Sequence, residues 1–340
     1  MITLLSVVLF LASAFTTRQL IVNSHRFSQL DIPNKRSSHV TPTPRGGGIA
    51  FVTASLIGFL LLLLSDSLNR TELFALCCAG VIVAIAGHLD DRQKISGATV
   101  RLVLHALGAI ILIIGVGIPT ELAFFDRTIN TGIVGLILGV VYLVWLLNLF
   151  NFMDGTDGIA ASETIFVALA GAFLNYQVHS DANHSAAAVI LAASTFGFLL
   201  YNWSPAKVFM GDVGSGYLGI VIGGLSLIAA NQDPDLLWVW VILLAVFVSD
   251  ATVTLIRRLL RKQKPHIAHR SHAYQHLAIR LNSHAKVALL VLAVNIAWLL
   301  PIAFLVADKQ LAGTTGVIIA YLPLLIAALA FSAGKDSATN

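Results

Sequence analysis

Long apolar runs alternate with short polar connections along the whole chain. About eleven runs of roughly 17–22 residues are each long enough to cross about 30 Å of hydrocarbon as a helix. Because the connections are short, they leave no room for a separate soluble domain of ordinary size. The pattern predicts an all-α integral membrane protein, in which residues 1–340 form one polytopic bundle of about 10–11 transmembrane helices. The expected spans are residues 2–22, 46–64, 71–87, 98–118, 132–150, 159–178, 186–202, 213–230, 236–256, 286–306 and 313–332.

The composition excludes an ordinary soluble protein. The chain is 57% hydrophobic and 11% charged, with a mean hydropathy of +0.85, whereas soluble domains are about 25% charged. The first apolar run lacks the basic residues that precede the apolar core of a cleavable signal peptide, and its basic residues follow from Arg18 onwards. We therefore interpret residues 2–22 as a retained first helix.

The distribution of Lys and Arg predicts the orientation. With the N-terminus outside, only Arg70, Arg127 and Lys309 of the 21 basic residues fall in outer loops, as expected when cytoplasmic loops carry the excess of positive charge. The net charge of +4 then belongs to a face that lies next to anionic lipid headgroups. It does not indicate a nucleic acid partner, and none is expected.

Nearly all the unusual chemistry falls in five expected inner loops. The richest is the run from Asn148 to Asp157, which places two amides and two carboxylates between two apolar runs, where an uncompensated charge costs about 2.5–3.5 kcal/mol or more. Asp-Gly occurs twice there, which favours tight turns that expose the carboxylates. The motif-bearing inner loops are residues 23–45, 88–97, 151–158, 203–212 and 257–285.

The carboxylates of these loops predict a cation site. Asp90 and Asp91 alone could do no more than hydrate the end of a span, but Asp154, Asp157 and Asp212 are expected at the same surface. Carboxylates gathered there repel one another unless a cation or a positively charged substrate pocket intervenes. Magnesium fits best, because it binds one or two carboxylates, keeps water and takes its remaining oxygens from substrate phosphates.

The segment from Phe209 to Ser215 opens the run 213–230. Its glycines, Gly211 and Gly214, would let a ligand approach the free amides of a helix N-terminus. The alternative is an Asp N-cap with packing glycines. Phe209 is either an aromatic anchor at the membrane interface or a platform that stacks on a base.

The last inner loop is rich in histidine. His269, His272 and His276 are spaced i, i+3 and i+7, so in a helix they would share one face. Zinc is one alternative, but no Cys or carboxylate lies close by in the sequence to complete its ligands, and surface histidines are often only solvated. With Arg270 beside them, a diphosphate-binding surface is favoured. The first inner loop, which ends at Arg45, is either a stiff turn or a second phosphate-binding segment.

Together these residues resemble the polyprenyl-phosphate N-acetylhexosamine-1-phosphate transferases, a family of glycosyltransferase family 4 type. The resemblance covers roughly Asp31 to His276 and rests on five motifs in order, each on an expected inner loop. The HRSHAYQH form is most similar to the O-antigen-initiating branch and departs from the consecutive three-histidine run of the peptidoglycan enzyme. The motifs are DIPNKRSSHVTPTPRGGG, HLDDRQK, NLFNFMDGTDGIA, VFMGDVGSGYLG and HIAHRSHAYQH.

The resemblance implies a reaction. A UDP-N-acetylhexosamine and undecaprenyl phosphate would give the undecaprenyl-diphosphate sugar and UMP, as the first step of O-antigen or related polysaccharide synthesis. Mg²⁺, or Mn²⁺ in its place, would be the cofactor. The resemblance further implies a multi-pass protein of the bacterial inner membrane, surrounded by membrane lipids, with its active site on the cytoplasmic face. UDP-N-acetylglucosamine is the default donor, a 6-deoxy amino sugar is the alternative, and a homodimer is one option for the oligomeric state.

The resemblance also implies roles for individual residues. Asp212 would be the main magnesium ligand, with Asp154 as the second. Asp90, with Asp91 beside it, would act as a base or orient a phosphate. Direct attack is favoured over a phospho-enzyme, because a phosphate monoester with a second pKa near 6 is largely ionised at pH 7. The substrate-binding residues would be Asn148 and Asn151 at the diphosphate, Asp157 and Phe209 at the uracil, His269, Arg270, His272 and His276 at the diphosphate or sugar, and Thr43 and Arg45 in the first loop.

Two other classes of protein are weaker candidates. A transporter would place ionisable groups near mid-membrane on broken helices, whereas the acidic residues expected within spans, Glu163 and Asp250, lie toward the inner ends. A magnesium-dependent polyprenyl-phosphate hydrolase would share the cation and the lipid but use water as the nucleophile. Exchange of labelled UMP into the UDP-sugar separates the three classes, because it requires a transferase.

Overall fold

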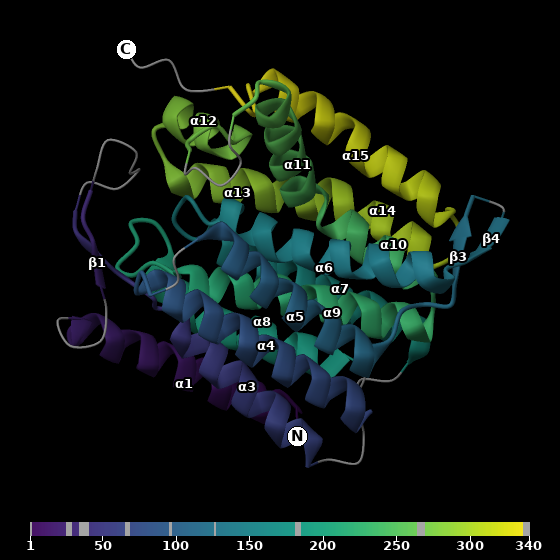
Figure 1. Cartoon of the computed structure of the whole chain (residues 1–340), viewed down its shortest axis with the longest axis horizontal. Coiled ribbons are helices and arrows are strands. Elements are labelled where there is room, and N and C mark those ends of the chain that lie inside the picture. Colours follow the sequence, from purple (N-terminus) through teal and green to yellow (C-terminus); the bar gives the residue numbers. More distant parts are fainter. Residues whose placement is uncertain are drawn as a thin grey trace.

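Helices of apolar sequence lie side by side through most of the molecule (Figure 1). The computed structural model describes residues 2–24, 29–33, 41–64, 69–94, 97–125, 127–180, 185–263 and 269–335, so parts of the predicted inner loops (25–28, 34–40, 95–96 and 264–268) lie outside the described residues. The helices are α1 (Ile2–Val22), α3 (Ile49–Leu63), α4 (Arg70–Asp91), α5 (Ala98–Val116), α6 (Gly132–Met153), α7 (Ile159–His179), α8 (Ala186–Asn202), α9 (Asp212–Gln232), α10 (Asp235–Leu243), α11 (Ala245–Leu260), α12 (Ala273–Leu281), α13 (His284–Val294), the π-helical turn η2 (Asn295–Leu299), α14 (Leu300–Ala307) and α15 (Gly313–Ala330).

The predicted polytopic helical fold is confirmed. Within the described residues, eight helical segments are long and apolar enough to cross a membrane, and α10 with α11 makes a ninth if the pair is one span. One of the eight is the continuous segment His284–Ala307, formed by α13, η2 and α14. Two further apolar helices, α3 and α8, are shorter. Each of the eleven predicted runs therefore coincides with a helix or a group of consecutive helices.

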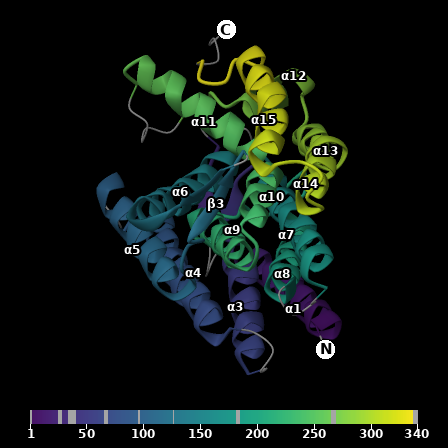
Figure 2. The ribbon, with the colours of Figure 1, turned by 90° about the vertical axis from the view of Figure 1, so that its right-hand side faces the viewer.

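One predicted span differs in shape from the expectation. The run 236–256 reads as a single span, but α10 and α11 meet at an angle of 71°. Hydropathy reports how apolar a segment is and not where its axis points, so the bend leaves no mark on the apolar pattern. Figure 2 shows α11 projecting from the bundle while α10 stays within it. Leu260 at the end of α11 is 78% exposed, as expected of a helix that faces lipid on one side.

Helix α9 lies at the centre of the bundle (Figure 2). It is buried along nearly its whole length and packs against α4 on one side and α6 on another. Small residues make this close packing possible, because they let two helix backbones approach each other. A Cβ atom at Gly219, for example, would lie 2.7 Å from the Leu146 carbonyl oxygen on α6. Tyr217 on the same helix forms a 2.7 Å hydrogen bond with Ser55 of α3.

Two short antiparallel hairpins accompany the helices. Strand β1 (Gln29–Asp31) pairs with β2 (Thr43–Arg45), and β3 (Glu121–Phe124) pairs with β4 (Arg127–Asn130) at the other end of the bundle (Figure 1). The Trp238 indole Nε1–H donates to the Ala123 carbonyl at 3.0 Å and holds the second hairpin against α10. Strands of three or four residues are too short to show an alternating pattern, which is why the sequence does not predict them.

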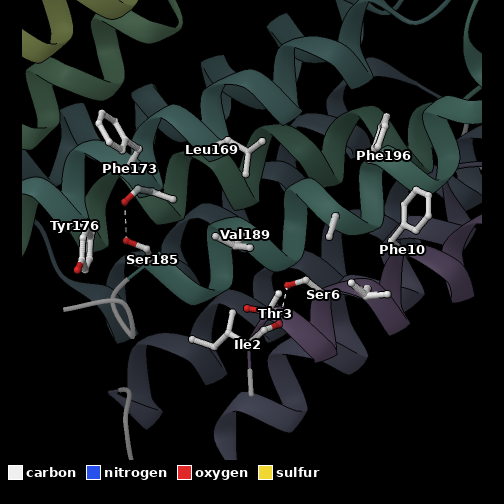
Figure 3. A pocket seen from close by; sticks show the side chains of 13 residues that line it. Ile2, Thr3, Ser6, Phe10, Leu169, Phe173, Tyr176, Ser185, Val189 and Phe196 are labelled. Atoms are coloured by element: carbon white, nitrogen blue, oxygen red, sulfur yellow. Dashed lines mark hydrogen bonds between the residues drawn. The ribbon is translucent and has the colours of Figure 1, made fainter. Parts of the chain in front are cut away.

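An open groove of about 590 Å³ lies between α1, α7 and α8 (Figure 3). Its wall is mainly apolar and includes Phe10, Phe173 and Phe196. The groove is lined by the first turns of α1 and the last turns of α7, whereas α7 begins beside the Asn148–Asp157 run. It therefore begins at the opposite end of the bundle from the predicted motifs and extends to Phe10 in the middle of α1 and Phe196 in α8.

Candidate functional site

The site begins where α4 ends and α9 starts. The Asp91 carboxylate, at the last residue of α4, accepts hydrogen bonds from the backbone N–H groups of Asp212 (3.0 Å) and Val213 (3.1 Å). These two residues open α9, so Asp91 satisfies two amides that a helix N-terminus leaves without partners. The partial positive charge at that end of α9 favours the carboxylate. Asp91 is therefore, in the first place, the residue that fixes the start of α9.

Two glycines allow α4 and α9 to approach this closely. Gly211 has φ +76°, and a Cβ atom there would lie 2.6 Å from the Asp91 carboxylate. A Cβ atom at Gly87 would overlap the Asp212 backbone. The sequence predicts that Gly211 lets the backbone approach a ligand; in the structure the group that it admits is the Asp91 side chain.

Arg45 joins the first inner loop to this junction. Its Nε lies 2.9 Å from Asp91 Oδ1 and its Nη2 lies 2.6 Å from Asp212 Oδ1. Burial alone would lower the pKa of Arg45, but the charges of Asp212 and Asp91 outweigh it and raise the pKa. The side chain is held because β2 lies beside the 203–212 loop: the Phe209 N–H donates to Pro44 (2.8 Å) and the Gly47 N–H donates to Phe209 (2.9 Å). Thr43, on the same strand, is buried.

A second guanidinium enters from α5. Arg101 Nη1 lies 2.7 Å from Asp90 Oδ2 and 3.7 Å from Asp212 Oδ2. Arg101 is not predicted from the sequence, because it lies inside an apolar run. The signal that could have found it is a lone basic residue in the first turn of a span that follows the Asp90-Asp91 loop. Carboxylates and guanidiniums thus alternate in one cluster that links three separate motifs.

Only some residues of the Asn148–Asp157 run lie at this cluster. Asn151 Nδ2 donates to Ser215 Oγ at 3.2 Å, which joins the end of α6 to the first turn of α9. Asn148 Nδ2 instead donates to the Val144 carbonyl of its own helix. The Asp154 carboxylate forms no hydrogen bond or ion pair with any described residue. Burial raises the pKa of Asp154 well above its usual value; the positive charge of Arg45 opposes this shift, and the negative charges of Asp212 and Asp91 add to it.

Asp157 belongs to a neighbouring set of contacts. Its Oδ2 accepts the Ala206 backbone N–H at 3.2 Å and lies 3.2 Å from His284 Nδ1. Burial would raise the pKa of Asp157, but the contact with His284 and the Ala206 N–H together hold it below its usual value. Asp157 therefore ties the 151–158 loop to the 203–212 loop, which also carries Phe209, and to the start of α13. His284 is a contact that the sequence analysis did not identify.

The histidine segment differs from the prediction. His269 and His272 precede α12, so only His276 lies in that helix and the three do not share a helical face. The reason is that His272 has extended backbone and acts as the N-cap of α12. The imidazole rings of His269 and His272 instead stack, with centroids 5.0 Å apart. His276 Nε2 lies 3.0 Å from the Lys335 carbonyl oxygen and faces the C-terminal segment.

The histidine segment nevertheless lies beside the Asn148–Asp157 run. The ring of His272 is 6.2 Å from that of Phe152, and Tyr274 Oη donates to the Phe152 carbonyl at 2.9 Å. Arg270 is half-buried next to the histidine pair. The described parts of the five motif loops therefore lie at one end of the bundle.

The side chains of the site can be compared with the ligands that a metal ion needs. Among the described residues, no group of three or more His, Cys, Asp or Glu side chains is arranged to hold one. Magnesium does not need such a group, because one or two carboxylates, water and substrate phosphates complete its shell. Asp154, a carboxylate without a partner among the described residues, and the neighbouring Asp212 supply hard oxygen donors of that kind. The donor chemistry therefore fits Mg²⁺ bound together with a phosphate.

Comparison with known proteins identifies the family of the chain. The family model described as glycosyl transferase family 4 matches residues 73–230, which include Asp90, Asp91, Asp154 and Asp212. A probable undecaprenyl-phosphate N-acetylglucosaminyl 1-phosphate transferase of Bacillus subtilis is 32% identical over 260 residues, covering 73% of this chain and 71% of the relative.

Two further relatives have similar names. A decaprenyl-phosphate N-acetylglucosaminephosphotransferase of Mycolicibacterium smegmatis is 27% identical over 82% of this chain and 75% of its own length. A phospho-N-acetylmuramoyl-pentapeptide-transferase of Streptococcus pneumoniae is 29% identical over 67% of this chain and 70% of its own length. The fold and the site thus define a polytopic membrane transferase. The chain belongs to glycosyl transferase family 4.

Proposed function

We propose that the protein transfers an N-acetylhexosamine-1-phosphate from a UDP-sugar to undecaprenyl phosphate, giving the undecaprenyl-diphosphate sugar and UMP. The observation that carries the proposal is the cluster of Asp90, Asp91, Asp212, Arg45 and Arg101, which gathers three motifs at one end of the apolar helices. Relatives named as polyprenyl-phosphate sugar-1-phosphate transferases support it. Enrichment of the motif loops in Lys and Arg supports a cytoplasmic active face in a bacterial inner membrane.

The reaction exchanges one phosphorus–oxygen bond for another. An oxygen of the lipid phosphate attacks the phosphorus that bears the sugar, and the bond between the two phosphates of the donor breaks to release UMP. The attacking group is already an oxyanion at neutral pH, so the chief task of the site is to bring two negatively charged substrates together. Arg45 and Arg101 supply fixed positive charge for this, in the manner of guanidinium groups that bind phosphates. Asp90 would orient the attacking phosphate or accept its remaining proton.

We assign the cofactor Mg²⁺, or Mn²⁺ in its place, to Asp212 and Asp154. The lack of a hydrogen bond or ion pair between Asp154 and any described residue, with Asp212 nearby, supports this assignment. When bound, the ion would neutralise charge on the transferred phosphate. Asn151 lies within hydrogen-bonding reach of Ser215 at the same junction and would help to shape the diphosphate pocket.

The substrate groups beyond the phosphates are assigned by the resemblance of the motifs. Asp157 and Phe209 would hold the uracil, and the stacked pair His269 and His272, with Arg270, would contact the diphosphate or the sugar. UDP-N-acetylglucosamine is the proposed donor, in line with the names of two relatives. Initiation of O-antigen synthesis is the proposed pathway, with a homodimer as one assembly to test.

In the test, undecaprenyl phosphate and a panel of UDP-sugars are added to membranes that contain the protein. The mass of the lipid product is then measured by mass spectrometry. Product heavier than the acceptor by one N-acetylhexosamine phosphate is expected only with a divalent cation. Asp212→Ala should abolish it. Asp233→Ala, which alters an acid paired with Lys309 at 3.1 Å at the other end of the bundle, should not. Exchange of labelled UMP into the donor distinguishes a transferase from a hydrolase or a transporter, and its absence would refute the proposal.

A further inference from the structure

A buried carboxylate outside the cluster controls the start of α12. Asp250 lies in α11, and its side chain is 8% exposed. Its Oδ1 accepts the backbone N–H of Ala273 at 2.9 Å, and its Oδ2 accepts that of Tyr274 at 2.9 Å. Oδ1 also lies 3.3 Å from His272 Nδ1. One side chain thus binds the first two amides of α12 and lies beside the imidazole of the residue that caps that helix.

We propose that Asp250 is a positioning residue for the transfer reaction, which holds His272 and the start of α12 against the loop that carries Asp154. The inference rests on the proposed function, because it assigns a task to a residue that touches neither substrate. The sequence analysis considered Asp250 only as an ionisable residue within a span, and it lies outside the family-model match at residues 73–230.

The contact reaches the loop that carries Asp154 through Tyr274. Its amide is bound by Asp250, and its Oη donates to the Phe152 carbonyl at 2.9 Å. Gly155, directly after Asp154, packs against the Tyr274 hydroxyl so tightly that a Cβ atom would overlap it. A shift of α12 would therefore be passed to the backbone on both sides of Asp154.

The same carboxylate also lies beside the histidine pair. His272 is 2% exposed, and its ring centroid lies 5.0 Å from that of His269 and 6.2 Å from that of Phe152. His272 Nδ1 lies 3.3 Å from Asp250 Oδ1 without forming a hydrogen bond, so a change at Asp250 would act on the His272 ring and on the His269 ring stacked on it. Asp250 lies on the projecting helix α11, so the bend between α10 and α11 delivers this carboxylate to the histidine segment.

The first measurement is hydrogen exchange of the peptide that begins α12, because it reports the contact whether or not the protein transfers a sugar phosphate. In Asp250→Ala, the amides of Ala273 and Tyr274 lose charged acceptors and should exchange faster, on the order of 10–100-fold. Asp250→Asn keeps the size and one acceptor and should show a smaller increase. Unchanged exchange in Asp250→Ala would overturn the proposed contact.

The second measurement is steady-state kinetics with UDP-N-acetylglucosamine and undecaprenyl phosphate. Misplacing binding groups by about 1 Å costs on the order of 10²-fold, so Asp250→Asn should lower kcat/KM for the UDP-sugar by roughly 10–100-fold while the KM for the lipid stays within about twofold. Glu163→Gln is the matched control, since Glu163 is a buried acid whose described partner is Asn295 and not the histidine segment. It should leave both values unchanged.

The third measurement is a double-mutant cycle. If Asp250 acts through His272, then Asp250→Asn combined with His272→Ala should be no worse than the more damaging single change, because residues that act as one unit are not additive. The positioning role would be overturned if the losses caused by the two substitutions multiplied in the double variant. It would also be overturned by an equal loss of kcat/KM for both substrates. A wild-type protein that makes no lipid product with any UDP-sugar would instead refute the proposed function, and the exchange result would still decide whether the Asp250 contact forms.

Discussion

The assignment of Asp91 as an anchor for α9 leads to a prediction that separates it from its neighbour Asp90. Replacing Asp91 by Asn keeps the shape of the side chain but leaves only one oxygen to accept hydrogen bonds. The carboxylate accepts two backbone N–H groups, at 3.0 and 3.1 Å, and faces Arg45 Nε at 2.9 Å. Its side chain is only 9% exposed, so water does not replace what is lost.

The magnitude follows from these contacts. A hydrogen bond to a charged group contributes about 1.5–3 kcal/mol, and a negative charge at a helix N-terminus adds about 0.3–1 kcal/mol. Asp91→Asn loses one such bond and the charge. Burial and the charge of Asp212 disfavour the ionised form of Asp91, which offsets part of that loss, so we expect a destabilisation of about 2 kcal/mol, at the lower end of the sum. Asp90→Asn removes an ion pair with Arg101, whose side chain is 34% exposed, and pairs of that kind are worth about 0–1 kcal/mol.

The assay is thermal unfolding of the two variants in the same detergent, together with UMP exchange. Asp91→Asn should lower the apparent Tm by roughly 4–8 °C and reduce exchange. Asp90→Asn should leave the Tm within about 2 °C while reducing exchange at least as strongly. Equal Tm values for the two variants would refute the structural role given to Asp91, and normal exchange in Asp90→Asn would refute the functional role given to Asp90.

Three further predictions concern neighbouring residues. The raised pKa of Asp154 means that the folded state binds a proton more tightly than the unfolded chain, so stability falls as the pH rises above about 4. Asp154→Asn should therefore raise the Tm at pH 7.5, abolish product formation and reduce the stabilisation by Mg²⁺. An unchanged Tm would contradict this. The lowered pKa of Asp157 has the opposite effect on stability: the charged side chain stabilises the fold fully above about pH 4, and this stabilisation is lost as the pH falls through the pKa of the folded state. Asp157→Asn should therefore be less stable than wild type at pH 7 but not at pH 2.5. Its KM for UDP-sugar should rise more than its KM for the lipid. Gly211→Ala should lower the Tm, because a side chain at φ +76° costs about 1–3 kcal/mol and meets the Asp91 carboxylate; a wild-type Tm would show that the α4–α9 junction is looser than described.

Much of the fold could be predicted from the sequence. Each apolar run had to become a helix, because only a helix satisfies its own backbone within hydrocarbon. The meeting of the motif loops at one end also followed, since alternate connections of spanning helices lie on the same side. Both conclusions depend on composition and order along the chain, which a single sequence contains.

The details of the site depend on direction and pairing, which the sequence does not contain. The pattern did not separate Arg101 from its apolar neighbours, and the bend between α10 and α11 left no mark on hydropathy. The spacing of His269, His272 and His276 suggested one helical face, but Asp250 occupies the amides at which α12 begins, so the helix starts after His272. Asp157 was assigned to the nucleotide without its contact with His284, which comes from a span more than a hundred residues away.

The enclosure of α9 has a consequence for how substrates enter. Neighbouring helices touch its glycines on several sides, so sliding or rotating α9 would displace all of them together. Its first residue, Asp212, is therefore a stationary point. Any adjustment that admits a nucleotide sugar and a lipid phosphate must be made by the elements that converge on it, which are the first hairpin with Arg45 and the segment that leads into α12.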